Sequence, residues 1–288
     1  MIPDDISTPD RNNTTGMTTT TLVFIGAGNM AGSIIGGLIS NNHDPEHIIA
    51  ADPNPETLQS LKARLGIRIA ENNSDAVQKA DIVILAVKPQ VMKAVVSELS
   101  PALQNARPVL ISIAAGITIA SINDWSGGNL PVVRCMPNTP ALLGCGANGL
   151  YASPQVSEAQ KTLAETVMNA VGICRWLDSE SAIDTVTALS GSGPAYFFLL
   201  MESMINAGKQ LGLPPETATA LTLQTALGAA RMAAEGGIEV AELRRRVTSP
   251  GGTTEQAINT LEQGGFHTLV QSAIDAAEQR SRELANQD

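Results

Sequence analysis

A short apolar run that leads directly into a glycine-rich turn is the feature that most constrains the fold of this chain. Leu22–Ile25 is followed by Gly26-Ala27-Gly28-Asn29-Met30-Ala31. The first glycine permits a tight turn, and the second lets a pyrophosphate approach the backbone. The helix that follows supplies free N–H groups and a partial positive charge. The motif therefore predicts a dinucleotide-binding turn between a buried strand and a helix. A glycine-rich turn without a ligand is the alternative.

Further apolar runs extend this pattern over the first half of the chain. They cover residues 48–51, 81–87, 109–113, 132–135 and 173–177. Because they are apolar throughout rather than alternating, they are typical of strands buried on both faces of a parallel sheet. The stretches between them are long enough for crossover helices. The pattern predicts an α/β domain, a doubly wound parallel sheet, over residues 21–178.

The second half has a different pattern. Ala, Leu, Met and Gln recur at helical spacing over residues 196–211, 216–235, 239–247, 254–263 and 267–285. Glycine and proline separate these stretches, which indicates a helical domain over residues 179–288. The helix over 216–235 carries little charge on any face. Such a helix is expected to be buried, and a partner chain is a natural cover.

Composition excludes several classes of function. The formal net charge is −10 among 288 residues, so there is no electrostatic footprint for nucleic acid or anionic lipid. Three cysteines without a CxxC spacing argue against a disulfide scaffold or a metal site. The three cysteines are expected to be buried. Their number and spacing also fit a protein of the reducing cytoplasm. Residues 1–20 are polar and predict a disordered extension. No run approaches roughly 18 apolar residues, so no membrane span is predicted.

Polar residues at the ends of predicted strands complete a candidate cofactor site. Asp52 follows the second strand, where a carboxylate can accept hydrogen bonds from a ribose 2′-OH and would repel a 2′-phosphate. We therefore expect NADH to be used at least as well as NADPH. A turn or N-cap residue before Glu56 is the alternative for Asp52.

Two later strands end in residues that suit the same ligand. One ends in Ala86-Val87-Lys88-Pro89, which places the Lys88 amine near a phosphate, a ribose or a substrate carboxylate. The next ends in Ala114-Ala115-Gly116, whose small side chains leave room for a nicotinamide. Asn138 follows another strand in a proline-stiffened loop. It is a candidate for binding ribose, carboxamide or substrate, with a purely structural turn as the alternative.

Two polar, glycine-rich stretches interrupt the helical half. They are SGSGPAY over residues 190–196 and VTSPGGTTE over residues 247–255. The second opens the helix expected from Thr254. Hydroxyls and free N–H groups at a helix start form a neutral cradle for a small carboxylate, although Ser and Thr are also common helix caps.

Several motifs resemble those of the pyrroline-5-carboxylate reductase family. The resemblance covers about residues 22–284, and VTSPGGTTEQAI is its most specific motif. The others are IGAGNMA, LAVKPQ, SIAAGI, RCMPNTPA and ALSGSGPAY. The chain departs from the family in Asp52, where some members have Ser, and in the polar extension before Thr21.

The resemblance implies an N-terminal Rossmann domain, a C-terminal helical dimerisation and substrate domain, and reduction of 1-pyrroline-5-carboxylate to L-proline with NADPH or NADH. It implies interlocked dimers, often assembled into a ring of five, with an active site to which the partner contributes. The implied cofactor contacts are Gly26, Ala27, Gly28, Asn29, Met30, Asp52, Asn73, Ala86, Val87, Lys88, Pro89, Ala114, Ala115 and Gly116. The implied substrate contacts are Ser249, Gly251, Gly252, Thr253 and Thr254.

The expected chemistry needs a proton and a hydride but little else. If the ring imine binds already protonated, catalysis is mostly positioning, and Thr254 can orient the ring N–H or relay a proton, with Lys88 assisting. Two other functions compete with this one. A β-hydroxyacid dehydrogenase would need a lysine four residues after Gly193, where Phe197 stands. A dinucleotide-sensing protein would bind cofactor without turnover.

Overall fold

The computed structural model describes residues 19–285, which divide into two compact units. One contains Gly193–Asp275, and the other contains residues 19–192 together with 276–285. The extension predicted for residues 1–20 falls outside the described residues except for Thr19 and Thr20.

The first unit along the chain is built on one sheet of eight strands in the order β3-β2-β1-β4-β5-β6-β7-β8. Its neighbouring strands are parallel except for the antiparallel pair β6–β7. The doubly wound sheet predicted from the apolar runs is therefore confirmed. The strands are β1 Leu22–Ile25, β2 Ile48–Ala51, β3 Arg68–Ile69, β4 Ile82–Leu85, β5 Val109–Ser112, β6 Val132–Met136, β7 Gly146–Ala152 and β8 Gly172–Trp176.

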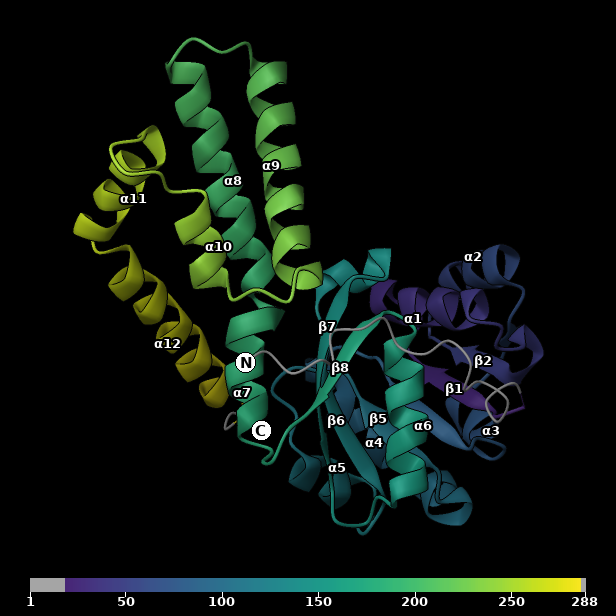
Figure 1. Cartoon of the computed structure of the whole chain (residues 1–288). Coiled ribbons are helices and arrows are strands. Elements are labelled where there is room, and N and C mark those ends of the chain that lie inside the picture. Colours follow the sequence, from purple (N-terminus) through teal and green to yellow (C-terminus); the bar gives the residue numbers. More distant parts are fainter. Residues whose placement is uncertain (1–18, 286–288) are drawn as a thin grey trace. The chain divides into compact units, whose positions relative to one another are not determined.

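Helices cover both faces of this sheet (Figure 1). Helices α1, α2 and α6 pack on one core, and α3, α4 and α5 pack on the other. In β1, Leu22 and Phe24 belong to the first core while Val23 and Ile25 belong to the second, which explains the uninterrupted apolar run. The helices are α1 Asn29–Ser40, α2 Pro55–Leu65, α3 Asn73–Val77, α4 Pro89–Ala106, α5 Ile119–Trp125, α6 Glu158–Asn169 and α7 Ala182–Val186. Shorter turns are η1 Pro45–His47 and η2 Thr139–Leu143, both 3₁₀, and the π-helix η3 Thr187–Gly191.

Two strands were missed by the sequence analysis. Strand β3 has only two residues, and β7 reads GANGLYA, without the apolar run that marks the others. The glycines of β7 allow other groups to pack closely against the strand. A Cβ on Gly149, for example, would lie 2.7 Å from a methyl of Val186. Strand β7 is also antiparallel to β6, which no apolar pattern indicates.

The expectation that all the cysteines are buried was partly wrong. Cys135 and Cys174 are buried, but Cys145 is exposed. Burial raises the pKa of the Cys174 thiol to about 12 and that of Cys135 well above its usual range, so neither thiol is a nucleophile at neutral pH.

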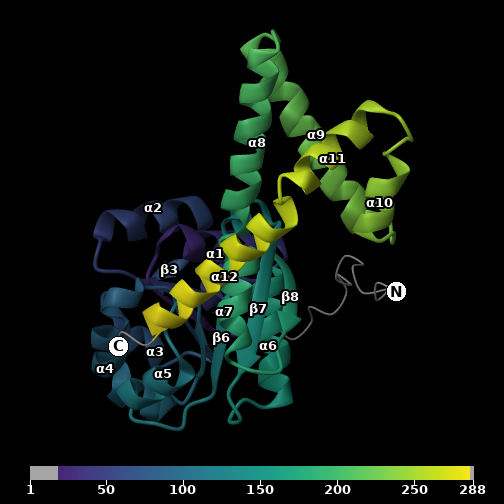
Figure 2. The same cartoon turned by 90° about the vertical axis from the view of Figure 1, so that its left-hand side faces the viewer.

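The second unit is helical, as predicted. It holds α8 Gly193–Gln210, α9 Pro215–Glu235, α10 Val240–Arg246, α11 Thr253–Gln263 and the first half of α12 Phe266–Ala285. Helices α8 and α9 run side by side as an antiparallel hairpin (Figures 1 and 2). None of the helices of residues 19–285 has the length and apolar character needed to cross a bilayer.

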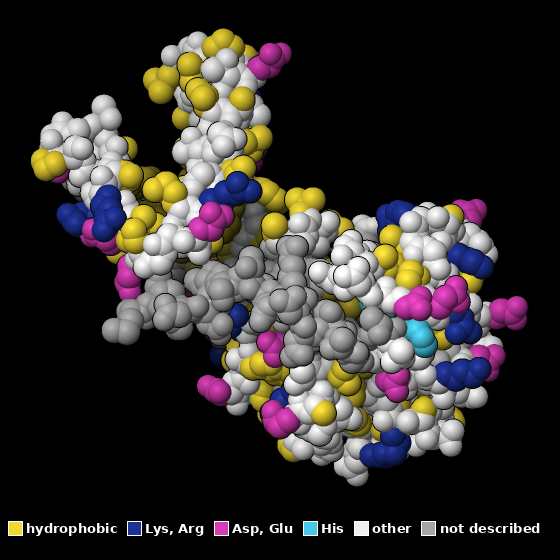
Figure 3. Space-filling view, turned by 45° about the vertical axis from the view of Figure 1, so that its right-hand side comes forward, with side chains coloured by type: hydrophobic (Ala, Val, Ile, Leu, Met, Phe, Trp, Pro, Cys, Tyr) yellow, Lys and Arg dark blue, Asp and Glu magenta, His cyan; other side chains and the backbone are white. Residues whose placement is uncertain are grey.

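Apolar side chains lie uncovered along this hairpin, and Figure 3 shows hydrophobic side chains gathered on it. Phe197 and Phe198 on α8 are 65% and 63% exposed, and Leu221 on α9 is 58% exposed. The expectation that the helix over 216–235 is buried is therefore not met within a single chain. Exposed apolar faces of this extent are typical of protein–protein contact sites.

Helix α1 must lie very close to the segment after α6, and a pair of neighbouring glycines tests this. A Cβ on Gly37 would overlap the carbonyl oxygen of Ala170, whereas one on Gly36 would meet open space. We expect Gly37→Ala to lower the free energy of unfolding by about 1–3 kcal/mol because backbone must move. Gly36→Ala should leave it unchanged or raise it by up to about 1 kcal/mol. Urea unfolding at one protein concentration measures both, and equal stability of the two variants would contradict the packing.

Candidate functional site

The glycine turn between β1 and α1 has the geometry that the motif predicts. Gly26 has φ +101°, and a Cβ there would lie 2.7 Å from the carbonyl oxygen of Ala86. Gly28 is the N-cap residue of α1, and a Cβ on it would meet nothing within 4 Å. No described side chain caps α1. The N–H groups of its first turn are therefore available to an anion, which fits a dinucleotide pyrophosphate.

Asp52, at the end of β2, holds this turn in place. Its Oδ2 accepts a hydrogen bond from the Ala27 N–H at 2.8 Å, and its Oδ1 accepts one from the Asn54 N–H at 2.9 Å. The side chain that caps α2 is that of Asn54, which accepts from Glu56 and Thr57, so Asp52 is not the N-cap residue. The bond from the Asn54 N–H to Asp52 is that of an Asx turn, so the turn part of the alternative is confirmed. A carboxylate has about four acceptor positions, so two remain for a ribose hydroxyl.

A pocket of about 350 Å³ adjoins the glycine turn on the side of α2. Its walls come from the turn itself and from one face of α2. The lining residues are Ala27, Gly28, Asn29, Glu56, Thr57, Ser60, Leu61 and Arg64.

The ends of β4 and β5 lie at the same edge of the sheet as the glycine turn, because β1, β4 and β5 are parallel neighbours. Lys88 is exposed and is the N-cap residue of α4, which no described side chain caps. Gly116 follows β5 with φ +76°, and Leu284 of α12 lies against it. Asn73 opens α3 after the neighbouring strand β3. The structure thus brings the predicted cofactor residues to one sheet edge.

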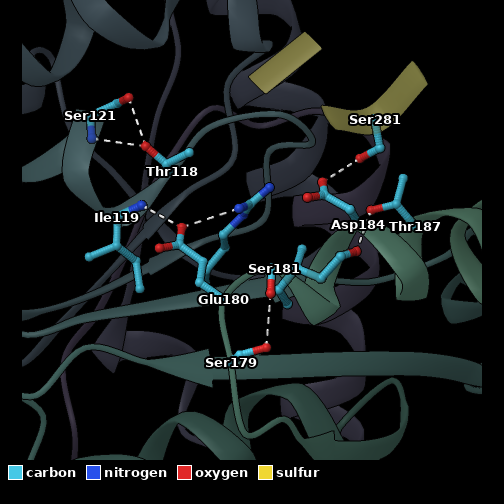
Figure 4. Close-up of polar contacts among 11 residues, drawn as sticks. Thr118, Ile119, Ser121, Ser179, Glu180, Ser181, Asp184, Thr187 and Ser281 are labelled. Carbon is cyan, nitrogen blue, oxygen red and sulfur yellow. Dashed lines mark hydrogen bonds and ion pairs between the residues drawn. The ribbon is translucent and has the colours of Figure 1, made fainter. Parts of the chain in front are cut away.

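A network of hydrogen bonds fixes the loop after β5 (Figure 4). Glu180 accepts from the Ile119 N–H at 2.7 Å and from the buried Arg134 guanidinium at 3.1 Å. Nearby, Ser281 donates to Asp184 at 2.7 Å and ties the end of α12 to α7. Sequence reasoning missed both carboxylates. Their partners lie 46 to 97 residues away along the chain, so no local pattern could have found them.

Asn138 is buried and bonded at both ends of its amide. Its Nδ2 donates to the Ser190 carbonyl at 3.0 Å, and its Oδ1 accepts from the Ala147 N–H at 2.9 Å. These bonds join the turn after β6 to β7 and to the π-helix η3. They favour the structural alternative for this residue, and its contact with cofactor stays a prediction.

The hydroxyl-rich loop of the helical unit lies between α10 and α11. Gly251 has φ +70°, and its N–H donates to the Glu255 carboxylate at 2.8 Å. Gly252 is the N-cap residue of α11, and none of the described side chains caps that helix. The predicted substrate residues Ser249, Gly251, Gly252, Thr253 and Thr254 all fall in this loop or in the first turn of α11. The Gly251 and Gly252 N–H groups are already bonded, to the Glu255 carboxylate and the Ser249 carbonyl, so the donors left for a small anion are those of Thr253 and Thr254 in the uncapped first turn of α11.

The three arginines before this loop bond within the protein. Arg244 on α10 pairs with Glu262 on α11 at 2.9 Å, which joins the two helices that flank the loop. Arg245 and Arg246 both bond to Glu242 and lower the pKa of that carboxyl to about 2. These ion pairs are lost only when the Glu242 carboxyl is protonated, which happens as the pH falls through its lowered pKa. The contacts therefore persist over the whole neutral pH range.

The open glycine turn, the uncapped α1 and the strand ends around them define a class: a nicotinamide-dinucleotide-dependent oxidoreductase with a Rossmann fold. Comparison with family models agrees. Residues 21–116 match the model described as "NADP oxidoreductase coenzyme F420-dependent". Residues 180–284 match the model described as "Pyrroline-5-carboxylate reductase dimerisation".

Curated relatives cover almost the whole chain. A pyrroline-5-carboxylate reductase of Pseudomonas aeruginosa is 56% identical over 94% of this chain and 99% of its own length. One of Haemophilus influenzae is 42% identical over 91% and 97%. The chain belongs to the pyrroline-5-carboxylate reductase family.

Solved structures support the same assignment. A pyrroline-5-carboxylate reductase of Coxiella burnetii has a TM-score of 0.90 and 47% identity, covering 93% of this chain and 99% of that one. The Plasmodium falciparum pyrroline carboxylate reductase "with NADP bound" has a TM-score of 0.82 and 30% identity, covering 94% and 100%. The family and the fold establish this chain as an NAD(P)H-dependent oxidoreductase.

Substitution of Gly26 should affect mainly stability, whereas substitution of Gly28 should affect mainly dinucleotide binding. We expect Gly26→Ala to lower the melting temperature, because the new Cβ collides with the backbone at Ala86 and φ is positive. Gly28→Ala should melt normally, since its Cβ meets open space in the protein, yet bind dinucleotide at least about tenfold more weakly because that space is where the pyrophosphate approaches. Calorimetric titration with NADPH and thermal melting measure the two effects. Unchanged binding by Gly28→Ala would contradict this placement of the pyrophosphate.

Proposed function

We propose that this chain reduces 1-pyrroline-5-carboxylate to L-proline, with both halves of the chain serving one reaction. The observation that carries the proposal is the uncapped start of α11, where the hydroxyls and N–H groups of one loop suit a small carboxylate. The relatives named as pyrroline-5-carboxylate reductases support it over nearly the full length of the chain. The functional division that we propose is a dinucleotide-binding domain over 21–178 and a helical dimerisation and substrate domain over 179–288.

The cofactor would be held by residues at the sheet edge and supplies the hydride when bound. The pyrophosphate would lie on the turn of Gly26, Ala27, Gly28, Asn29 and Met30, because that helix start is open. The ribose and nicotinamide would contact the neighbouring strand ends. These contacts are assigned to Asp52, Asn73, Ala86, Val87, Lys88, Pro89, Ala114, Ala115, Gly116 and Asn138.

The chemistry requires that hydride reach the imine carbon while the ring nitrogen carries a proton. An imine that binds already protonated is the better hydride acceptor, and the product is then the neutral ring amine of proline. In our proposal the carboxylate binds to Ser249, Gly251, Gly252 and Thr253, and Thr254 accepts a hydrogen bond from the ring N–H or returns a proton to it. The three histidines lie elsewhere: in the turn after α1, in η1 and in the first turn of α12.

The assembly that we propose is a homodimer, and beyond it a pentamer of dimers. The dimerisation model matched by residues 180–284 and the exposed apolar faces of α8 and α9 support a homo-oligomer. In such a dimer the partner would contribute to the substrate pocket. We place the enzyme in the cytoplasm, in line with its cysteine content.

Turnover separates this proposal from a dinucleotide-sensing protein. The purified chain is mixed with NADPH or NADH and 1-pyrroline-5-carboxylate, and the absorbance of the reduced nicotinamide is followed while L-proline is quantified. Loss of absorbance with equal formation of proline supports the reductase. Cofactor binding without turnover would instead support the sensor.

Removing the Thr254 hydroxyl should slow the reaction. We expect Thr254→Ala to lose at least about tenfold in kcat/KM, because the ring N–H loses its partner, and Thr254→Ser to retain most of the activity. Thr260→Ala is the matched control, since Thr260 lies later in α11 and its hydroxyl only bonds back to the Gln256 carbonyl. Steady-state kinetics at saturating NADPH measure the effect, and a normal value for Thr254→Ala would remove this residue from the mechanism.

Lys88 is expected to act in binding rather than in folding. It is exposed, and its amine forms no ion pair with any residue in 19–285. Lys88→Ala should therefore raise the KM for cofactor or substrate by about tenfold and leave the melting temperature unchanged. Lys93→Ala, an exposed lysine on the same helix, is the control. A large fall in melting temperature with a normal KM would reverse the interpretation.

A further inference from the structure

The guanidinium of Arg64 lies over the first turn of α1, which its position in the sequence does not reveal. Arg64 stands in the last turn of α2. Its Nη2 is 3.0 Å from the point that a Cβ on Gly32 would occupy. Gly32 directly follows the motif of the glycine turn, so the absence of a side chain there gives the guanidinium its place. The arginine therefore reaches across from α2 to the helix start that is predicted to bind phosphate.

This cation has no partner within the described part of the chain. The guanidinium makes no hydrogen bond and no ion pair with any described residue. Glu56 faces the same pocket but does not pair with it. A positive charge beside the positive end of a helix dipole is electrostatically unfavourable unless an anion joins them. The site is therefore built for an anion that is part of the ligand.

The remaining wall of the pocket suits a phosphate. Thr57 and Ser60 present hydroxyls from the same face of α2 as Arg64, and Gly28 and Asn29 present the start of α1. The volume of about 350 Å³ is far more than a single phosphate needs, so a phosphorylated sugar can enter. Arginine with hydroxyl donors is a common way to bind a phosphate monoester.

The position of the pocket identifies which phosphate it takes. Ala27 lines the pocket and is bonded to Asp52, the residue at the end of β2 where this fold binds the adenosine ribose. Both oxygens of Asp52 accept backbone N–H bonds, which offsets part of its charge and weakens its repulsion of a nearby phosphate. A ribose bound beside Asp52 would present its 2′ position to the pocket that holds the Arg64 guanidinium.

We infer that Arg64 is a specificity-determining residue that binds the adenosine 2′-phosphate of NADPH in the pocket between α1 and α2. The inference rests on the proposed function and deepens it, because it names the preferred cofactor. It revises the expectation from Asp52 that NADH is used at least as well as NADPH. Arginine directly after β2 is the usual sequence sign of NADP binding, and here the cation comes instead from the third turn of α2.

The test compares ligands that differ only in the 2′-phosphate. Dissociation constants for NADPH and NADH are measured by nicotinamide fluorescence, and inhibition constants are measured for adenosine 2′,5′-bisphosphate and 5′-AMP. We expect the wild-type protein to bind NADPH the more tightly. Arg64→Ala should weaken NADPH and the bisphosphate at least about tenfold and change NADH and 5′-AMP less than about twofold. Lys62→Ala removes an equal charge from the same turn of α2, outside the pocket, and should leave all four constants unchanged.

The outcomes separate this inference from the proposed function. If wild-type protein reduces 1-pyrroline-5-carboxylate but Arg64→Ala keeps the same NADPH-to-NADH ratio, the inference is wrong and the function stands. If Arg64→Ala weakens NADPH and NADH equally, the guanidinium binds the pyrophosphate, which also overturns the inference. If wild-type protein binds neither dinucleotide, the proposed function itself fails. Melting curves test whether each variant is folded, which is expected because Arg64 and Lys62 are exposed.

Discussion

The peptide at Gly26 is held by contacts with β1, β2 and the end of β4. The geometry of the sheet edge that is predicted to bind the cofactor depends on it. Its N–H donates to the carbonyl of Ala51 at 2.8 Å, and its α-carbon lies so close to Ala86 that only glycine fits. The Ala86 N–H in turn donates to the carbonyl of Ile25 at 2.8 Å. These contacts lock the direction in which the chain leaves β1. They therefore set the direction of α1 and the place where its open N-terminus meets a ligand.

Electrostatics add a second requirement. The chain carries a net charge of −10, yet both candidate cofactors are anions and the proposed substrate carries a carboxylate, so binding of these groups has to overcome long-range repulsion. The structure meets this locally, with open helix starts at α1, α4 and α11 and with cations that no described carboxylate neutralises, Lys88 and Arg64. Other arginines form ion pairs with glutamates of the same chain. Arg134 bonds to Glu180, and Arg244 bonds to Glu262.

The helical unit leaves many of its apolar residues exposed. Helices α8 and α9 pack on each other along one side and leave large side chains, including Phe197 and Phe198, exposed. A two-helix hairpin has too little interior to cover them. These exposed faces agree with the dimerisation family whose model matches residues 180–284, because a second copy would cover them. Folding and assembly are expected to be coupled in such a protein.

The sequence alone determined the architecture and the kind of ligand. Continuous apolar runs and a Gly-x-Gly turn have local physical causes, burial on both faces and backbone freedom, so the strands β1, β2, β4, β5, β6 and β8 and the helices α8 to α12 could be predicted. Strands β3 and β7 could not, because one is very short and the other is rich in glycine that serves packing by distant side chains.

The tertiary structure decided which polar groups are free to bind. Asn138 looked available along the chain, but the fold bonds both ends of its amide to backbone groups. Asp52 accepts one backbone N–H on each oxygen and keeps two acceptor positions. Arg64 is far from the glycine motif in the sequence, but the packing of α2 places its guanidinium over the first turn of α1. Hydrogen bonds and unpaired charges depend on groups that are distant in sequence and close in space. For that reason the sequence could predict a dinucleotide at this edge, and only the packing of α2 against α1 could show which side chains line the pocket beside the glycine turn.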